Sequence, residues 1–524
     1  MKVLAVTGKL AEKDVRRYAS EVDVDIDVLV LPVLVASFIT PDYASVALKR
    51  AKLEGYDMIL MPGSVLGDVS KVEHSTGIPT FKGSVHAADM PLVLSHLDEI
   101  ELSKTIPASE LLKDLLKYRA IAELESVDAN WHRIIQEKGG LVIGGEGYEV
   151  PVGPGFPMRV IAEIVNAPLL DSHSVEKKAQ YFEAEGADII DIGMLAGSPR
   201  SEEVPGLIEA VRRSSSLPIS IDTIEPSEIE AAVKCGIDLV LSVDSGNMEA
   251  VAPTVSDTPA VVLPSDIGGG KLPATAEERA IALEKNIERA MNLGMSKVIA
   301  DPIFEPPLIP GMIESLKTYQ IFRWLNEDTP LLFGLGNATE LIDVDSPGVN
   351  GILTAFACEV GANLLFVPEF SPKTRGSVPE TARASHMMFL ANMRGSTPKD
   401  LGIDLLILKQ KRWKEDTYNK DIEKNVEVVD AEEDEHFEDD KTGWFRISVD
   451  RDERMVIAAH YLRNAEEPDL IIKGSRVRYI YQTAIRRGLV SRLDHAAYLG
   501  KELEKAAISL RLGRAYIQDE KLFS

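Results

Sequence analysis

The sequence predicts an α/β protein built on a central (β/α)8 TIM barrel, with an N-terminal Rossmann-like or flavodoxin-like α/β domain and a small C-terminal α+β domain. Three observations lead to this prediction. Eight apolar strand-like segments alternate with helical patterns in residues 159–396. A shorter alternation of the same kind fills residues 1–120, and strands followed by helices fill residues 441–524. Such alternation is typical of parallel sheets covered by helices.

In residues 1–120, the strand-like segments VLAVTG, DVLVLP and YDMILMPG are separated by helical patterns, which indicates βαβ units. Turns at Thr7-Gly8, Pro62-Gly63 and Lys82-Gly83-Ser84 follow predicted strands, at the edge where open α/β sheets bind ligands. No G-x-G-x-x-G motif accompanies these turns. A dinucleotide is therefore not predicted for this domain.

Residues 121–158 are predicted to connect this domain to the barrel through a helix and a hairpin, GGLVIGGEGYEVPVG, which would close the barrel floor. The eight predicted barrel strands are RVIAEIVN, DIIDIG, PISIDT, DLVLSV, PAVVLP, KVIADP, PLLFGL and NLLFVP. Each is apolar and rich in Val, Ile or Leu, as strands buried on both faces must be. Eight strand–helix units are the number that a (β/α)8 barrel requires.

The pattern of the barrel ends near residue 396. Residues 397–440 contain the acidic run EDTYNKDIEKNVEVVDAEEDEHFEDD, and we predict an acidic linker there. Residues 441–524 then show three strand-like segments, WFRISVD, RMVIAAHY and DLIIKGS, followed by two helical patterns. This order of elements predicts the small C-terminal α+β domain.

Composition narrows the range of partners. The chain has 83 acidic and 57 basic residues, for a formal net charge of -26. Such a surface repels nucleic acid and anionic membranes, so neither is predicted as a partner. The two cysteines, Cys235 and Cys358, have no C-x-x-C neighbour, which argues against disulfides and thiolate-bound metal. No apolar run suits a signal peptide or a membrane span, and the expected location is the cytoplasm.

Polar residues stand at the ends of most predicted barrel strands, where barrels of this kind place their chemistry. These groups are hydrogen-bond acceptors or amides, with no histidine and few cations among them. Ionised carboxylates accept hydrogen bonds only, so such a set suits a flat heterocycle rich in donors. The residues are Asn166, Asp191, Asp222, Ser242 with Asp244, Asp301 and Asn337.

The segments EGADIIDIG, PISIDT and VIADP, in this order, resemble the pterin-binding barrel family. That family includes dihydropteroate synthases and methyltransferases that act on reduced folates or methanopterins. The resemblance implies that Asp222 and Asp301 bind the aminopyrimidinone edge of a pterin. It also implies that Asn166 lies where synthases use an asparagine near a diphosphate and its magnesium. The three-part chain as a whole resembles an archaeal group described as dihydropteroate synthase-related.

The sequence departs from the synthase pattern at several strand ends. Ser242 stands where synthases have asparagine, with Asp244 close by. Asn337, in GLGN, replaces the synthases' Ser-Arg-Lys and is similar to the asparagine of the methyltransferase branch. Arg200, in GMLAGSPRS, resembles part of the synthases' Ser-Thr-Arg-Pro loop. Lys373, after the eighth strand, would either meet an anion or lie on the loop without a ligand.

The resemblance implies a pterin-binding transferase of folate or tetrahydromethanopterin metabolism, with three interpretations open. In methyl transfer, Asn337 would polarise a reduced methylpterin, and a corrinoid or another methyl-acceptor protein would be the partner. In a synthase, Asn166 and Arg200 would hold a pterin diphosphate with Mg²⁺, and an arylamine would attack. In the third, the barrel is a non-catalytic pterin-binding scaffold. A homodimer is expected from the resemblance, and no protein-bound metal site is predicted.

Overall fold

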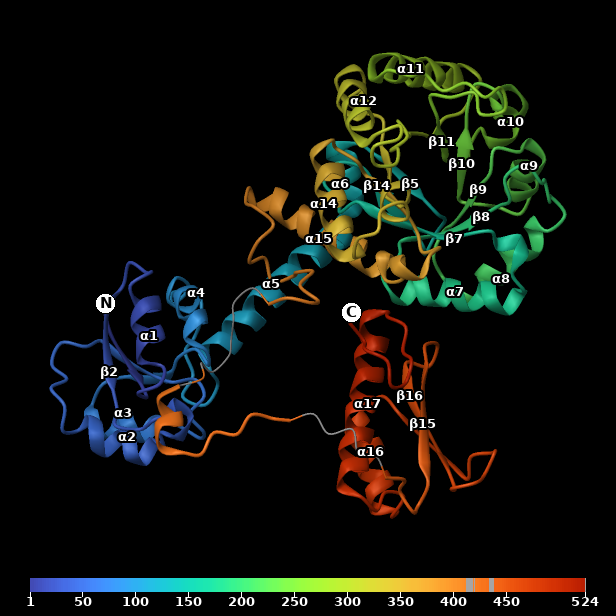
Figure 1. Ribbon diagram of the computed structural model, residues 1–524. Helices are drawn as coiled ribbons and strands as arrows, with labels where there is room; N and C mark the ends of the chain where they lie inside the picture. Colours follow the sequence, from blue (N-terminus) through green and yellow to red (C-terminus); the bar gives the residue numbers. More distant parts are fainter. Residues whose placement is uncertain (411–417, 419, 433–437, 524) are drawn as a thin grey trace. The chain divides into compact units, whose positions relative to one another are not determined.

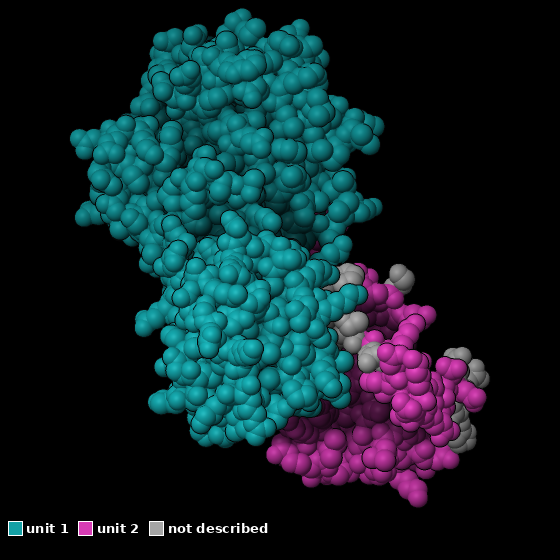
Figure 2. Space-filling model, turned by 90° about the vertical axis from the view of Figure 1, so that its left-hand side faces the viewer, with its two compact units in different colours: residues 1–368, 377–417 teal, residues 369–376, 418–524 magenta. Residues whose placement is uncertain are grey.

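A computed structural model describes residues 1–410, 418, 420–432 and 438–523. The chain forms two compact units, which Figure 2 distinguishes by colour. The first comprises residues 1–368 and 377–417, and the second comprises residues 369–376 and 418–524. Within the described residues, no helix combines the length and the apolar character that crossing a membrane requires.

The central part of the first unit is a parallel eight-stranded barrel, as predicted, with helices around its outside (Figure 1). Its strands follow the order β12-β11-β10-β9-β8-β7-β14-β13. A parallel bridge between Ala300 and Leu331 joins the two ends of this order and closes the barrel. The strands are β7 (Arg159–Ile164), β8 (Ile189–Gly193), β9 (Ile219–Asp222), β10 (Leu239–Val243), β11 (Ala260–Val262), β12 (Val298–Ala300), β13 (Leu332–Gly334) and β14 (Leu364–Pro368).

The barrel helices pack an extensive apolar layer against the outside of the strands, which includes Phe182 and Phe322. Helix starts follow ordinary capping chemistry: Thr275 and Glu278 form a capping box at the start of α11. The helices are α7 (Ser172–Ala184), α8 (Val204–Ser214), α9 (Pro226–Lys234), α10 (Met248–Val255), α11 (Ala276–Asn292), α12 (Met312–Leu325), the short α13 (Gly336–Thr339), α14 (Ser346–Glu359) and α15 (Ser377–Arg394).

A second apolar cluster fills the inside of the barrel, with Ile161, Ile189 and Leu364 among its members. The hairpin of β5 (Leu141–Ile143) and β6 (Val150–Val152) contributes Ile143 and Val152 to the same cluster. The hairpin therefore covers the amino-terminal end of the barrel with apolar side chains. The acids described below lie at the opposite, carboxyl end of the strands.

The N-terminal part of the first unit is a parallel sheet of order β2-β1-β3-β4. Apolar clusters lie on both faces of this sheet, as in Rossmann-like folds. Helix α5 packs Ala120 against Leu390 of α15, and Glu123 pairs with Arg394 at 2.6 Å. The elements are β1 (Lys2–Thr7), α1 (Glu12–Ala19), β2 (Asp25–Val30), α2 (Pro41–Leu48), β3 (Met58–Met61), α3 (Ser70–Thr76), β4 (Thr80–Lys82), α4 (Met90–Leu94), α5 (Ala108–Ala129) and α6 (Trp131–Lys138).

The second unit contains a three-stranded antiparallel sheet of order β15-β16-β17 with two helices on one face. The alternation in WFRISVD places Phe445 and Ile447 in the core between sheet and helices. The elements are β15 (Trp444–Asp450), β16 (Met455–Tyr461), β17 (Leu470–Gly474), α16 (Val477–Arg486) and α17 (Leu493–Leu512). Both cysteines are free, and part of the predicted acidic linker lies outside the described residues. The bounds of the five sequence-based segments stay a prediction.

Candidate functional site

Four carboxyl groups gather at the carboxyl end of the barrel strands. Asp191 lies in β8, Asp222 ends β9 and Asp301 follows β12 directly. The fourth is Glu163 of β7, which the sequence analysis did not single out. Oxygens of Glu163, Asp191 and Asp222 lie within 4.8 Å of one another. None of the ion pairs among the described residues includes any of these four groups.

Strand register brings three of these acids together. Glu163 of β7 is directly opposite Asp191 of β8, and Gly193 is opposite Asp222 of β9. A Cβ atom on Gly193 would lie 2.2 Å from Glu163 Oε1, so the carboxyl group occupies the space that this glycine leaves open. Glycine is therefore needed at this position for Glu163 to reach the cluster.

Burial without a cationic partner raises the pKa of all four acids. Burial, then the charges of Asp222 and Glu340, raise the pKa of Glu163 to about 8. Burial and the charge of Asp301 raise the pKa of Asp222 to about 7. Burial and the charges of Asp222 and Glu163 raise the pKa of Asp191 well above its ordinary value. Around neutral pH the cluster therefore retains protons.

Asp301 accepts hydrogen bonds from the loop that follows β12 and from helix α12. Burial raises its pKa to about 6, opposed by hydrogen bonds from the Ile303 amide at 2.8 Å and the Tyr319 hydroxyl at 3.3 Å. Both donors bind Oδ1. Tyr319 is fully buried beside Phe333, with ring centroids 5.0 Å apart. Asp301 is thus the most readily ionised of the four acids and is fixed in orientation.

Asn337 lies on α13, and the residue is exposed. Its amide nitrogen donates to the Phe304 carbonyl at 2.7 Å, which joins the turns after β13 and β12. This bond uses one of the two N–H donors, so the amide oxygen and the second N–H are what Asn337 can offer to a ligand. Asn166, two residues beyond β7, is in the left-handed conformation (φ 52°) that asparagine tolerates.

The remaining predicted site residues are engaged in other contacts. Asp244 accepts hydrogen bonds from the amides of Gly246 and Asn247 and from Ser265, so it organises the loop after β10. Ser242 is buried, and its carbonyl accepts from Asn247.

Of the two predicted cations, Arg200 lies in the same compact unit as the four acids and contacts other groups. Arg200 donates to Glu203 at 3.0 Å, and its amide donates to the buried Glu228 at 2.7 Å. Lys373 is in residues 369–376, which belong to the second unit. The structure therefore brings Asp191, Asp222 and Asp301 together with Glu163, and the printed partners of Arg200 lie outside this cluster.

Glu163 carried a signal that the sequence analysis did not use. It is an acid inside an otherwise apolar strand, and it follows Ile161, which faces the barrel interior, by two residues. Side chains alternate along a strand, so Glu163 faces the same side as Ile161. The same spacing relates Asp191 to the interior-facing Ile189.

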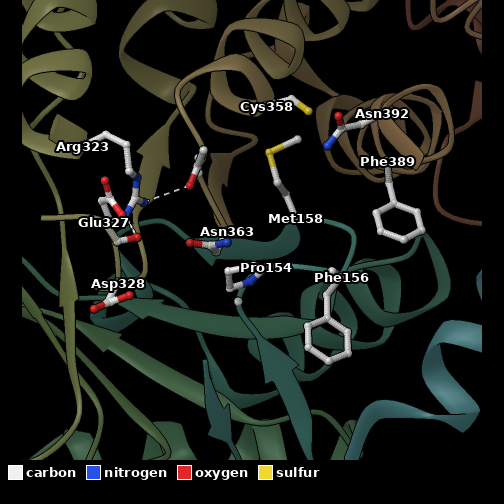
Figure 3. Close-up of a pocket in the computed structure, with 14 residues that line it drawn as sticks. Pro154, Phe156, Met158, Arg323, Glu327, Asp328, Cys358, Asn363, Phe389 and Asn392 are labelled. Atoms are coloured by element: carbon white, nitrogen blue, oxygen red, sulfur yellow. Dashed lines mark hydrogen bonds between the residues drawn. The ribbon is translucent and has the colours of Figure 1, made fainter. Parts of the chain in front are cut away.

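A separate cavity of about 280 Å³ lies at the opposite end of the barrel, with Pro154, Met158, Asn363 and Phe389 in its lining (Figure 3). Met158 and Asn363 immediately precede β7 and β14. Arg323, on one side of the cavity, donates to the carbonyls of residues 326, 327, 329 and 361. Since its donors serve the backbone and barrel chemistry belongs at the other end, we assign this cavity no role in the site.

Comparison with known proteins agrees with this geometry. Residues 167–346 match the family model described as pterin binding enzyme, and this range includes Asp191, Asp222 and Asp301. Residues 1–85 match a family of unknown function, DUF6513, and residues 439–519 match a family described as PterinBD-DUF4346. The central barrel is therefore a pterin-binding barrel.

The uncharacterized protein MJ0107 of Methanocaldococcus jannaschii is 40% identical over 537 residues, covering 100% of this chain and 99% of that protein. The chain belongs to the same family as this archaeal protein. Among solved structures, the dihydropteroate synthase of Thermus thermophilus in complex with 6HMPPP is 25% identical, covering 44% of this chain and 92% of its own, with a TM-score of 0.35. The Xanthomonas albilineans synthase with 4-aminobenzoic acid is 20% identical, with coverages of 47% and 96% and a TM-score of 0.38.

Proposed function

We propose that the barrel binds a reduced, methylated pterin and that the protein transfers its methyl group to a nucleophilic acceptor. The observation that carries this proposal is the set of four carboxyl groups, Glu163, Asp191, Asp222 and Asp301, without an ion-paired cation among the described residues. The residues fit the ligand, because an ionised carboxylate such as Asp301 accepts hydrogen bonds only, which suits the donor-rich N–C–N edge of a pterin. A carboxylate can accept two parallel hydrogen bonds from such an edge.

The charge of the site favours methyl transfer over condensation with a pterin diphosphate. A diphosphate would bring further negative charge to a cluster that already retains protons to reduce its own repulsion. At an effective dielectric constant of about 20, two unit charges about 4 Å apart interact by about 4 kcal/mol. A reduced pterin that is protonated on its ring is attracted by the same cluster.

Each residue then has a role in the transfer. Asp222 and Asp301 accept hydrogen bonds from the pterin edge and fix the ring. Asn337, exposed at the end of β13, offers its amide oxygen to a proton on the ring nitrogen that carries the methyl group. As the methyl group forms its bond to the acceptor, the electron pair of the broken C–N bond stays on that nitrogen, which leaves as a neutral amine. A positioned group of this kind contributes on the order of 10²-fold or more to the rate.

Calorimetric titration with three ligands tests the proposal. The ligands are a methyl-tetrahydropterin, an unmethylated tetrahydropterin, and a hydroxymethyl-dihydropterin diphosphate with Mg²⁺. We expect the methylated pterin to bind most tightly and the binding to be lost in Asp222→Ala and weakened in Asn337→Ala. Asp188→Asn, just before the other end of β8, is the matched control and should bind normally.

Two outcomes would contradict methyl transfer. Preference for the diphosphate, with Asn337→Ala harmless, would support a synthase-type condensation. Binding of all pterins alike, with no methyl transfer to a cobalt(I) corrinoid or to a thiol, would support a scaffold.

A further inference from the structure

Asp191 is the most enclosed of the four acids. Its side chain is 0% exposed, and its Oδ1 accepts a hydrogen bond from Ser220 at 2.6 Å. Its Oδ2 is also buried, and no donor among the described residues reaches it. The titratable groups that act on it are Glu163 on β7 and Asp222 on β9, the two neighbouring strands. Asp191 is thus surrounded by one hydroxyl donor and two further acids.

An ionised Asp191 would be unfavourable in these surroundings. A buried carboxylate needs hydrogen-bond donors or a cation to replace the water it has lost, and Ser220 supplies one donor only. Two neighbouring acids add repulsion. A proton on Oδ2 removes the charge and turns this atom into a donor. The neighbouring acceptors are Glu163 and Asp222, each with an oxygen within 4.8 Å of an oxygen of Asp191.

We propose that Asp191 is a positioning residue that stays protonated at neutral pH, and that its Oδ2–H orients the carboxyl groups of Glu163 and Asp222 toward the ligand. The identity of that ligand as a pterin rests on the proposed function. Burial and both acidic neighbours raise the pKa of Asp191 in the direction that this role requires. The acid therefore acts through Glu163 and Asp222 and does not touch the pterin.

This role separates Asp191 from Asp301, which also lies at a strand end. Asp301 has two donors on Oδ1 and is ionised at neutral pH, so it acts as an acceptor. A neutral amide can replace a protonated acid but cannot replace an ionised one. Asp191→Asn should therefore preserve binding, whereas Asp301→Asn should not.

The first test is infrared spectroscopy of the ligand-free protein at neutral pH. A protonated carboxyl group has a C=O stretching band that is well separated from the bands of carboxylates. We expect the wild-type spectrum to contain a band of this kind from Asp191, in addition to that of Glu163, and this band should be absent from Asp191→Asn and present in Asp301→Asn. If Asp191→Asn retained every such band of the wild type, the proposal would be overturned, whatever the ligand of the barrel is.

The second test compares pterin binding by Asp191→Asn and Asp191→Leu, which is similar in size but offers no donor. We expect Asp191→Asn to bind within about 3-fold of wild type with a flatter pH profile, and Asp191→Leu to bind at least about 10-fold more weakly. Equal losses in both variants would overturn the role of the proton. If wild type binds no pterin while the infrared band is found, the proposed function fails and the assignment of Asp191 stands.

The alternative to a proton is a divalent cation, because three carboxyl oxygens at this spacing could also surround one. Titration with Mn²⁺ alone tests this alternative. We expect no binding that depends on Asp191. Stoichiometric Mn²⁺ binding that is lost in Asp191→Asn would show that a metal, and not a proton, neutralises the cluster.

Discussion

Polar side chains at the two ends of the barrel differ in how many hydrogen-bond partners the protein gives them, although the same strands form both ends. At the amino end, Asp188 accepts from the Val160 amide, Asp238 accepts from the Ile219 amide, and Asn363 accepts from the Leu331 amide. Each of these residues immediately precedes one strand and binds the start of its neighbour. Arg159, also buried there, pairs with Asp128 and Asp188.

At the carboxyl end, the acids have few partners from the protein. Asp191 of β8 is three residues beyond Asp188, yet one of its oxygens receives no donor from the described residues. Glu163 and Asp222 have raised pKa values because burial is not offset by a cation. The comparison shows that polar groups at the amino end bind the backbone of neighbouring strands, while an oxygen of Asp191 at the carboxyl end has no donor among the described residues. Barrel enzymes in general divide stability and function between these two ends.

The largest expected effect is on binding, at the carboxyl end. Asp301→Asn keeps the size of the side chain and its bonds to Ile303 and Tyr319 but removes the negative charge. Since hydrogen bonds to charged groups contribute about 1.5–3 kcal/mol, we expect pterin affinity to fall about 100-fold, measured by calorimetry. Asp188→Asn should leave affinity unchanged. Equal losses in the two variants would remove the functional distinction between the ends.

The second effect is on stability, at the amino end. Arg159→Met removes the cation that pairs with Asp128 at 3.0 Å and with Asp188 at 3.4 Å. Breaking a buried pair is strongly destabilising, but both acids retain access to water, so we expect a loss of about 2–3 kcal/mol in the free energy of unfolding. Urea denaturation measures this loss. The folded variant should bind ligand normally.

The third effect is the pH dependence of stability. Glu163 has a pKa of about 8 when folded, against an ordinary value of 4.5, so its protonated form is favoured by folding. Its contribution is fully present below the ordinary pKa and is lost as the pH rises through about 8. We expect wild type to lose about 2 kcal/mol more than Glu163→Gln between about pH 6 and about pH 8. Parallel stability curves for the two proteins would show that Glu163 does not retain its proton.

The fourth effect concerns the space that the cluster needs. Gly193→Ala would place a Cβ atom 2.2 Å from Glu163 Oε1 and force this carboxyl group to move. We expect affinity to fall about 10-fold, with a loss of stability of about 1–3 kcal/mol from crowding. Gly206→Ala is the control, because a Cβ atom there meets nothing within 4 Å. Normal binding by Gly193→Ala would mean that the position of Glu163 is unimportant.

The smallest effect distinguishes the two transfer reactions. Arg200→Ala removes a half-buried guanidinium that pairs with Glu203, and pairs open to solvent contribute about 0–1 kcal/mol. For a methylated pterin we expect a change in affinity below about 3-fold. A much larger loss, confined to the pterin diphosphate, would assign Arg200 to a diphosphate site.

The sequence by itself determined the barrel and the positions of most strand-end acids. Runs such as DIIDIG and PISIDT are largely apolar because both of their faces are buried, and this property is legible without a structure. A carboxylate at the end of such a run, as at Asp222, can also be recognised from the neighbouring residues in the sequence. The sequence could not show which of these acids would be provided with donors by the protein.

Only the tertiary structure decided which of these acids receive hydrogen-bond donors from the protein. The sequence suggests the same strand-end position for Asp244 and Asp191, yet Asp244 accepts from loop amides after β10 while Asp191 lies within β8 and faces two other acids. Glu163 joins the cluster because β7 pairs with β8 in a register that sets it opposite Asp191, and because Gly193 leaves room for it. Donors and neighbours of this kind come from residues distant in the chain. Their arrangement depends on strand order and register, which the pattern of apolar residues along each strand does not specify.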